Sequence, residues 1–507
     1  MVLAGNRSGI GPSKAHPLTW RTMNEQGSLN VGRLLVASNR GPMSFGQDAD
    51  GTLTARRGGG GLVSGLAAVA DSADLLWICA AMSDADRAAA RRAPGGRLDL
   101  DGHDTAAQVQ MLDIPPGTFA AAYNSVANST LWFISHLLYD TPNKPAFDAG
   151  FARQWAAYRE YNTAFALALA ESVAGAGVRA MVQDYHLALV PAMLARLRPG
   201  TQITHFSHTP WAPPDYFRIL PGPVARELLE GILGADHAGF LAARWAGAFL
   251  DCCEDVLGAE VDRAARQVRY QDHVCTVGVH PLGVDAADLR HRSRAADVEA
   301  HVEALTEATK GRKLIVRVDR TELSKNIVRG LAAYRELLST HPELHGEVTH
   351  LAFAYPSRHD LPEYRAYTGS VQRIAEEINE EFGTPGWDPL ILEVKDDYAR
   401  SLAAYRMADV IVVNPIRDGM NLVAKEAPIV SDRGCALVLS REAGACAELG
   451  GDALVVNPYD VTATAQAMYE GLTMPQTERD RRCAALGKAG AALPPAQWLA
   501  SQLSALG

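Results

Sequence analysis

The chain has 507 residues, of which 48% are hydrophobic and 21% are charged, a composition typical of a globular protein with room for two domains. Its 48 basic and 58 acidic side chains give a formal net charge of −10, which argues against nucleic acid or an anionic membrane surface as the main partner. The seven cysteines include no Cys-x-x-Cys pair, so we expect a reducing, cytoplasmic setting.

The first 30 residues lack the apolar core of a secretory signal, and we expect them to form a disordered extension. No later run of about 18 uninterrupted apolar residues predicts a membrane-spanning helix. Beyond residue 30, short apolar runs predict strands that alternate with helical patterns. In the first half, the predicted strands are 34–38, 75–80, 178–183, 202–207, 236–240 and 275–280, and the predicted helices are 62–70, 150–175, 187–197, 223–233 and 241–257.

The second half repeats this alternation, with predicted strands at 313–318, 348–355, 390–394, 409–413, 435–440 and 453–456. The sequence therefore predicts an α/β protein of two Rossmann-like, doubly wound domains that face a central cleft and span residues 31–285 and 286–490. Residues 491–507 predict a last helix that crosses back to the first domain. Ligands are expected at the carboxyl ends of the strands, inside the cleft.

A strand, a glycine turn and a helix start follow one another around Asp418 and Gly419. This arrangement presents free backbone N–H groups and the positive end of a helix dipole at one point, which suits anions and sugar hydroxyls. Asp418 can accept hydrogen bonds from a sugar, and the amides of Met420 and Asn421 can donate to one. Glu426, about two turns into the helix, can reach a ribose. An ordinary amphipathic helix start is the alternative.

A second cluster follows the predicted strand at 313–318. Arg320 and Lys325 lie five positions apart, on either side of a turn and the next helix start. A permanently charged Arg and a point-charge Lys together suit a diphosphate. For this pair alone, two basic residues on a solvated loop are the alternative.

Residues 56–65 (Arg-Arg-Gly-Gly-Gly-Gly-Leu-Val-Ser-Gly) form a glycine-rich loop before a predicted helix. Glycines let the backbone approach a phosphate closely. The loop has neither the Gly-Lys-Ser/Thr of a P-loop nor the spacing of the dinucleotide fingerprint. A flexible hinge is the alternative.

Three further strand ends carry polar residues toward the expected cleft: Ser38–Arg40, Gln183–His186 and His208. His205 and His208 lie three positions apart on a strand and therefore face opposite sides, which disfavours a shared metal ion. We expect His205 to be structural and His208 to be functional.

Tyr123, Asn124 and Trp132 form a polar-aromatic stretch suited to stacking on a sugar, with a core tryptophan as the alternative for Trp132. Asp84-Ala85-Asp86 and Asp99-Leu100-Asp101 have the Asp-x-Asp spacing of some metal-dependent nucleotide-sugar enzymes, but their polar, loop-like surroundings disfavour that role. No metal site is predicted.

The ordered motifs resemble those of a known family, the trehalose-6-phosphate synthases, over the chain from about Leu34 to its end. These enzymes are retaining glycosyltransferases of the GT-B type, with two Rossmann-like domains. The motifs are Ser-Asn-Arg (38–40), Gly-Gly-Leu (60–62), Tyr-Asn…Asn…Leu-Trp (123–132), Gln-Asp-Tyr-His-Leu (183–187), His-x-Pro-Trp (208–211), Val-Asp-Arg…Ser-Lys (318–325), Ser357-Arg358 and Asp-Gly-Met-Asn-Leu-Val-Ala-Lys-Glu (418–426).

The resemblance implies two groups of site residues. The nucleotide-sugar group comprises Gly61, His208, Arg320, Lys325, Asp418, Gly419, Met420, Asn421, Leu422, Val423 and Glu426, of which Arg320, Lys325, His208 and Asp418 are the expected catalytic residues. The glucose 6-phosphate group comprises Arg40, Tyr123, Trp132, Asp184 and Arg358. Two arginines that meet one phosphate are what bidentate anion recognition needs.

The sequence departs from the family pattern in three places. Ala80 stands where the family usually has a second tryptophan shortly after the one at Trp77. Residues 322–326 read Glu-Leu-Ser-Lys-Asn in place of Asp-Tyr-Ser/Thr-Lys-Gly. The loop that packs on the base, where the enteric enzymes carry a Phe, reads Val-Lys-Asp-Asp at 394–397.

The resemblance implies transfer of glucose from a nucleoside diphosphate to C1 of glucose 6-phosphate, giving α,α-trehalose 6-phosphate with retained configuration. No paired carboxylates suggest a covalent intermediate, and no cofactor is expected. The expected partners are these small molecules, with neither nucleic acid nor membrane, and a homo-oligomer is an open alternative. A cyclitol-coupling pseudo-glycosyltransferase, another GT-B synthase and a catalytically silent sugar-phosphate sensor are the alternative functions. A silent member should have lost Arg320, Lys325 or Glu426, and all three are present.

For the donor base, the sequence favours guanine over uracil. Guanine presents two adjacent donors, N1–H and the N2 amino group, and one carboxylate can accept from both. Asp396 or Asp397, on the loop expected to meet the base, can supply that carboxylate. The alternative is that these acids only cap the helix beginning near Tyr398.

Overall fold

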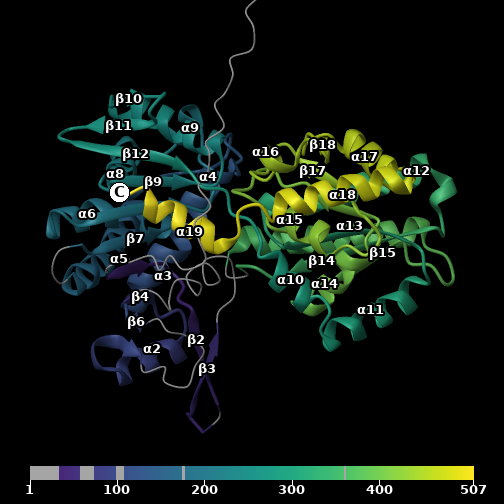
Figure 1. Cartoon of the computed structure of the whole chain (residues 1–507), viewed down its shortest axis with the longest axis horizontal. Coiled ribbons are helices and arrows are strands. Elements are labelled where there is room, and N and C mark those ends of the chain that lie inside the picture. The colour runs from purple at the N-terminus through teal and green to yellow at the C-terminus, as the bar shows by residue number, and fades with distance from the viewer. Residues whose placement is uncertain are drawn as a thin grey trace, which may run out of the picture.

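The computed structural model describes residues 33–48, 50–57, 74–98, 108–173, 177–358 and 361–506. Figure 1 shows two lobes side by side, each built on its own sheet with helices packed around it. The predicted α/β class with two Rossmann-like units is confirmed. The expected extension at residues 1–30, the glycine-rich loop after Arg57 and the predicted helix at 62–70 lie outside the described residues.

The first lobe holds a ten-stranded sheet whose central strands are all parallel. Apolar strands such as β1 and β4 are buried along their whole length, as a parallel sheet covered on both faces requires. In sheet order the strands are β10 (Glu260–Asp262), β11 (Gln267–Tyr270), β12 (His273–Val279), β9 (His237–Phe240), β8 (Gln202–Ser207), β7 (Arg179–Gln183), β1 (Leu34–Ala37), β4 (Leu75–Ala80), β6 (Gln108–Leu112) and β5 (Arg97–Leu98).

A separate two-stranded hairpin pairs β2 (Met43–Gln47) with β3 (Leu53–Arg57). The sequence did not predict this hairpin or the strands β5, β6, β10 and β11. These strands are short or half-exposed, so their apolar runs are interrupted by polar residues.

The second lobe holds a six-stranded sheet in which every pair of neighbours is parallel. All six of its strands match the apolar runs that the sequence predicts. In sheet order they are β15 (Leu390–Glu393), β14 (Val348–Tyr355), β13 (Lys313–Arg320), β16 (Val410–Val413), β17 (Ala436–Ser440) and β18 (Leu454–Val456).

Helices connect these strands, and several begin with an aspartate that accepts a hydrogen bond from the first turn, as Asp148 does for α5 and Asp460 for α17. No described helix has the length and apolar character needed to cross a membrane. The helices are α2 (Asp84–Arg92), α3 (Pro116–Ala120), the π-helix η2 (Ala121–Leu131), α4 (Trp132–His136), α5 (Ala149–Ser172), α6 (Val190–Leu197), α7 (Pro214–Phe217), α8 (Gly222–Leu233), α9 (Ala243–Cys252), the π-helix η4 (Cys253–Leu257), α10 (Ala286–Arg292), α11 (Ala296–Thr309), α12 (Ile327–Thr340), α13 (Pro362–Phe382), α14 (Tyr398–Met407), α15 (Val423–Val430), α16 (Cys446–Leu449), α17 (Val461–Thr473), α18 (Gln476–Gly490) and α19 (Pro495–Ser504), with short 3₁₀ turns η1 (Pro94–Gly96), η3 (Tyr185–Leu187), η5 (Leu323–Lys325) and η6 (Pro342–Leu344).

The chain passes between the lobes twice, and the two passages are hydrogen-bonded to each other. The amide of Gly283 donates to the carbonyl of Leu493 (2.7 Å), and that of Val284 donates to Gly490 (3.0 Å). After the second passage, α19 lies against the first sheet, where the Trp498 ring meets Phe206 edge-on at 5.0 Å. The domain limits 31–285 and 286–490, with the last helix at 491–507, remain our proposal for the division of the chain.

Candidate active site

The cleft between the two lobes has a volume of about 990 Å³ and is lined from both sides. The register of the sheets brings the carboxyl ends of several strands to its walls, because Gln183 of β7 pairs with Phe206 of β8 and Arg320 of β13 pairs with Tyr355 of β14. Its lining residues are Ser38, Asn39, Arg40, Tyr123, Asn124, Asn128, Trp132, Gln183, Asp184, Tyr185, His186, His208, Leu241, Leu282, Arg320, Lys325, Pro356, Ser357, Arg358, Leu361, Asp418, Met420, Asn421 and Leu422.

On the second-lobe wall, the cluster around Asp418 lies beside the cluster of Arg320 and Lys325. The Nζ of Lys325 lies 2.6 Å from the Asp418 carboxylate. Burial acts to lower the pKa of Lys325, but the neighbouring carboxylates, Asp418 foremost, outweigh it and raise that pKa. Arg320 is about half exposed, with its guanidinium 3.1 Å from the buried carboxylate of Glu322. Lys325 is therefore a held cation, whereas Arg320 presents its charge to the open cleft.

A fully buried arginine, which the sequence analysis did not name as a candidate, supports the loop that carries Lys325. Arg317, in the middle of β13, donates to the carboxylate of Asp319 (2.7 Å) and to the carbonyl of Lys325 (3.1 Å). Asn326, in the position where the similar family has Gly, has φ of 58°, a left-handed conformation that Asn tolerates better than most residues. Its amide also donates to the carbonyl of Pro458 (2.7 Å), so the departure from Gly is accommodated.

The turn at residues 418–421 is tied by its backbone to the loop at 442–445. The Asp418 amide donates to Glu442 (3.2 Å), and the Gly444 amide donates to Asp418 (3.1 Å). Gly419 packs so closely against the first lobe that a Cβ there would overlap the carbonyl oxygen of His208, which explains the glycine. Among the described residues, no acceptor is bonded to the backbone N–H of Met420 or Asn421.

A smaller pocket of about 210 Å³ continues the cleft beneath this turn. Its walls include Tyr355, Val423 and Glu426, and it shares Arg320 and Lys325 with the cleft. Burial raises the pKa of Glu426 to about 7.

On the first-lobe wall, Asp184 has a strained backbone, with φ of 72°, and its carboxylate accepts from the His208 amide (3.1 Å). Burial raises the pKa of Asp184 to about 6. The imidazole of His208 hydrogen-bonds to the Gln183 side-chain oxygen (3.0 Å), which makes Nε2 the donor. Burial lowers the pKa of His208 to about 4, so its ring is neutral near pH 7.

The π-helix η2 and the start of α4 carry the aromatic residues into the cleft, in keeping with the frequent use of π-helical turns at functional sites. The hydroxyl of Tyr123 accepts from the Arg40 guanidinium (3.1 Å), and its ring stacks on His186 at 5.6 Å. Trp132 packs on the ring of His136 at 3.9 Å.

Arg358 reaches from the second lobe to the first. Its guanidinium lies 3.9 Å from the centre of the Trp132 ring and donates to the hydroxyls of Tyr364 (2.8 Å) and Tyr185 (3.4 Å). Its backbone φ of 49° is uncommon for a residue other than Gly. The predicted acceptor residues Arg40, Tyr123, Trp132, Asp184 and Arg358 thus surround one end of the cleft.

The expectation that Asp396 or Asp397 reads the base stays a prediction for Asp396, whereas Asp397 has a structural role. The carboxylate of Asp397 accepts from the Arg400 amide (3.0 Å) at the start of α14 and lies 3.3 Å from His301, so it has the capping role named as the alternative. Asp396 is exposed, and neither acid lines the cleft or the smaller pocket. Ala80 is buried in β4 and does not line the cleft either, while Gly61 lies outside the described residues.

Two other candidates, Asp86 and His205, hydrogen-bond the protein's own backbone. Asp86 accepts from the amides of Phe45 (2.7 Å) and Met82 (3.1 Å), and Asp99-Leu100-Asp101 lies outside the described residues. His205 is fully buried against the Asp184 carbonyl (3.3 Å). In the part of the chain that the structure describes, no three His, Cys, Asp or Glu side chains are grouped as metal ligands.

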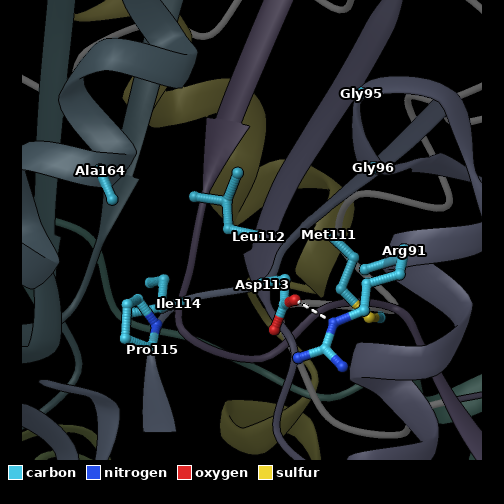
Figure 2. Close-up of a pocket in the computed structure, with 10 residues that line it drawn as sticks. Arg91, Gly95, Gly96, Met111, Leu112, Asp113, Ile114, Pro115 and Ala164 are labelled. Atoms are coloured by element: carbon cyan, nitrogen blue, oxygen red, sulfur yellow. Dashed lines mark hydrogen bonds and ion pairs between the residues drawn. The ribbon is translucent and has the colours of Figure 1, made fainter. Parts of the chain in front are cut away.

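A separate, open pocket of about 290 Å³ lies at the outer end of the first sheet, between β6, α2 and α5 (Figure 2). Its wall carries the ion pair between Arg91 and Asp113 (2.6 Å). It shares no lining residue with the cleft.

Sequence comparison reveals extended similarity to known proteins. A relative from Emericella nidulans named alpha,alpha-trehalose-phosphate synthase [UDP-forming] is 32% identical over 461 residues, covering 90% of this chain and 88% of the relative. A relative from Arabidopsis thaliana named probable alpha,alpha-trehalose-phosphate synthase [UDP-forming] 2 is also 32% identical, over 89% of this chain, which spans only 54% of that protein.

Solved structures agree with this similarity. The structure described as trehalose-6-phosphate from E. coli bound with UDP-2-fluoro glucose superposes with a TM-score of 0.82 at 27% identity, over 94% of this chain and 98% of that chain. An alpha,alpha-trehalose-phosphate synthase (UDP-forming) from Burkholderia vietnamiensis gives a TM-score of 0.81 at 28% identity, over 94% and 97% of the two chains. Because the model of glycosyltransferase family 20 matches residues 32–507, the chain belongs to that family.

Proposed function

We propose that this chain transfers glucose from a nucleoside diphosphate glucose to glucose 6-phosphate, forming α,α-trehalose 6-phosphate with retention of the anomeric configuration. The observation that carries the proposal is the charge of the cleft. Its lining includes the four cations Arg40, Arg320, Lys325 and Arg358 but only the two carboxylates Asp184 and Asp418, in a chain with a net charge of −10. A local excess of positive charge inside an acidic protein suits two phosphorylated substrates.

The cations are divided between two ends of the cleft, which supports one phosphate site at each end. Arg320 and Lys325 lie with Asp418 beside the free amides of the 418–421 turn, and we assign them to the diphosphate of the donor. Leu422, Val423 and Glu426 lie around the smaller pocket, which we assign to the nucleoside. Arg40 and Arg358 we assign to the phosphate of the acceptor.

Unpaired polar groups on the first-lobe wall support a sugar at the acceptor end. Among the described residues, Asn128 Nδ2, Trp132 Nε1 and Gln183 Nε2 are buried donors without an acceptor. A buried donor left unpaired costs about 1–3 kcal/mol. The oxygens of a bound sugar would supply the missing acceptors, and Asp184 would accept from its hydroxyls.

The proposed chemistry takes place on one face of the donor sugar. The bond from C1 to the diphosphate oxygen breaks, the acceptor hydroxyl attacks from the same face, and the leaving phosphate takes the hydroxyl proton. Arg320 and Lys325 offset the charge that develops on the leaving group, and their fixed positions make this preorganised electrostatic stabilisation. The neutral His208 supplies hydrogen bonding, since its depressed pKa keeps it uncharged. Arg358 contacts Trp132 across the cleft, and closure of the lobes around bound substrates would exclude water.

For the donor base, we propose uracil, as in the relatives named UDP-forming. The argument for guanine required a free carboxylate beside the base, and Asp397 is engaged at the start of α14. A second candidate, GDP-glucose, is supported by Asp396, which remains exposed on the same loop.

One assay tests the reaction and the base together. The purified protein is incubated with glucose 6-phosphate and either UDP-glucose or GDP-glucose, released nucleotide is measured, and the disaccharide product is identified by NMR. Trehalose 6-phosphate with both α linkages supports the proposal, whereas nucleotide release without this product would refute it. A higher kcat/KM for GDP-glucose that Asp396→Asn abolishes would identify guanine as the base.

A further inference from the structure

Trp245 of the first lobe makes a hydrogen bond to the turn that carries Asp418 in the second lobe. The side chain is fully buried on α9, and its indole N–H donates to the carbonyl oxygen of Gly419 at 3.0 Å. Two guanidinium groups lie over the indole, that of Arg417 at 4.4 Å and that of Arg244 at 4.5 Å from the ring centre. Such contacts between cations and an aromatic ring hold the indole in place.

The carbonyl groups on either side of Gly419 are bonded within the second lobe. Asp418 accepts from the Gly444 amide (3.1 Å), and Met420 accepts from the Ala445 amide (2.9 Å). The Gly419 carbonyl is different, because its bond comes from the other lobe. Trp245 thus supplies the hydrogen bond to this turn that the second lobe does not supply.

The orientation of one peptide group follows from this bond. The Gly419 carbonyl belongs to the same planar unit as the Met420 N–H, and in a trans peptide the two point in opposite directions. An indole that holds the carbonyl toward α9 therefore aims the Met420 N–H away from α9. Met420 lines the cleft, and no described residue accepts from its amide. A hydrogen bond to the carbonyl also polarises the peptide and strengthens its N–H as a donor.

We infer that Trp245 is a positioning residue for the donor: it aims the Met420 amide into the cleft at the nucleotide sugar and couples that aim to the contact between the lobes. This inference rests on the proposed function for the identity of the ligand. It does not rest on the acceptor site, which involves other residues of the first lobe, such as Arg40 and Trp132.

Arg417 makes a further contact between the turn and the first lobe. Its guanidinium is buried and donates to the carbonyl of Trp211 in the first lobe (2.9 Å) while lying over the Trp245 ring. Burial lowers the pKa of Arg417 to about 10, and the charge of Arg244 acts in the same direction. The strand-to-helix turn that binds the donor is thus seated on the first lobe through an indole and a guanidinium.

The test compares Trp245→Phe with Trp155→Phe. Phenylalanine keeps an aromatic ring under Arg244 and Arg417 but removes the indole N–H. Trp155 is a matched control, because its buried indole donates to Glu227 (2.8 Å) entirely within the first lobe. We expect Trp245→Phe to reduce kcat/KM for the nucleotide sugar by about 10- to 100-fold, as small displacements of catalytic groups do. The KM for glucose 6-phosphate should change no more than in Trp155→Phe.

Binding measurements separate positioning from general damage. Calorimetry of UDP-glucose, GDP-glucose and glucose 6-phosphate, each added alone, should show weaker binding of the nucleotide sugar in Trp245→Phe and unchanged sugar phosphate binding. Equal weakening of all ligands, or equal effects of the two Trp variants, would overturn the inference. If the wild-type enzyme forms no disaccharide, the proposed function fails, yet the nucleotide binding of the two variants still decides the role of Trp245.

A milder variant covers the case in which Trp245→Phe does not fold. Arg244 is substantially exposed, and its guanidinium bonds Glu442 (2.8 Å) and lies over the indole. Arg244→Gln should fold normally and weaken nucleotide binding in the same selective way, by a smaller factor. Unchanged nucleotide binding in Arg244→Gln would then count against the inference.

Discussion

The ammonium nitrogen of Lys325 lies 2.6 Å from a carboxylate oxygen of Asp418, although 93 positions separate the two residues in the chain. One residue follows β13 and the other follows the neighbouring strand β16. Each charge is buried in the presence of the other, so Asp418 holds the Lys325 ammonium in a fixed place at the wall of the cleft.

Replacing either donor-site cation should reduce turnover. We expect Arg320→Ala and Lys325→Ala to lower kcat by about 10²-fold or more, because both groups offset charge that develops as the phosphate leaves. Steady-state kinetics check this, with Lys488→Ala on the exposed side of α18 as a control of equal charge change. Near-normal kcat in both site variants would show that neither cation takes part in the chemical step. Since Lys325→Ala leaves Asp418 buried and unpaired, its folding is checked by circular dichroism.

Arg358 should set recognition of the acceptor phosphate. We expect Arg358→Ala to raise the KM for glucose 6-phosphate strongly and to affect free glucose much less. Arg358→Lys keeps the charge but loses the planar group that stacks on Trp132, so it should recover only part of the affinity. If both acceptors weakened equally in Arg358→Ala, this residue would not be reading the phosphate.

Asp397 should contribute to stability and not to the choice of base. Its carboxylate accepts from the Arg400 amide, and removing such a cap typically costs about 0.5–2 kcal/mol. Asp397→Ala should therefore lower the free energy of unfolding measured with urea, while the ratio of kcat/KM for UDP-glucose and GDP-glucose stays as in the wild type. A changed ratio with unchanged stability would show that Asp397 contacts the base and does not act as a helix cap.

Glu426 should make stability depend on pH. Burial raises its pKa to about 7, above the ordinary value of 4.5 for a glutamate. The folded state therefore binds more protons between these values, and the free energy of unfolding falls as the pH rises through them. Relative to Glu426→Gln, the wild type should lose stability between about pH 4.5 and about pH 7. Urea unfolding at several pH values checks this, and parallel curves for the two proteins would contradict it.

Catalysis should need no tightly bound metal ion, because Arg320 and Lys325 supply positive charge where the diphosphate is expected. Activity measured after extensive dialysis against EDTA should match that of the untreated enzyme. Loss of activity that Mg²⁺ or Mn²⁺ restores would show that these two cations are insufficient.

The sequence predicted the central strands because continuous apolar runs such as Val410 to Val413 are needed only where both faces of a strand are buried. Strands at or next to the sheet edge, such as β10 and β11, bury one side at most, so their patterns resemble those of loops. The hairpin β2–β3 was missed for the same reason.

The candidate site was predicted where polar residues follow strong strands, as at Arg40, Asp184 and Asp418. Residues that support these groups gave no local signal. Arg317 lies inside a predicted buried strand, and only the fold shows that its guanidinium bonds the Lys325 loop. Likewise, Trp245 is one of many core aromatics until the fold places its indole against Gly419. Asp397 did give a signal, but the signal was ambiguous. An aspartate before a helix can cap the helix or face a ligand, and only the folded backbone shows which.

The paired passages between the lobes define an axis. Because the Gly283 amide donates to the carbonyl of Leu493, the two connecting segments run together, and a rotation of one lobe relative to the other would take place about this one region. Arg358 joins the lobes inside the cleft through its contact with Trp132, so such a rotation would break this contact as the cleft opens. Under the proposed function, the arginine assigned to the acceptor phosphate would then withdraw together with the lobe that carries it.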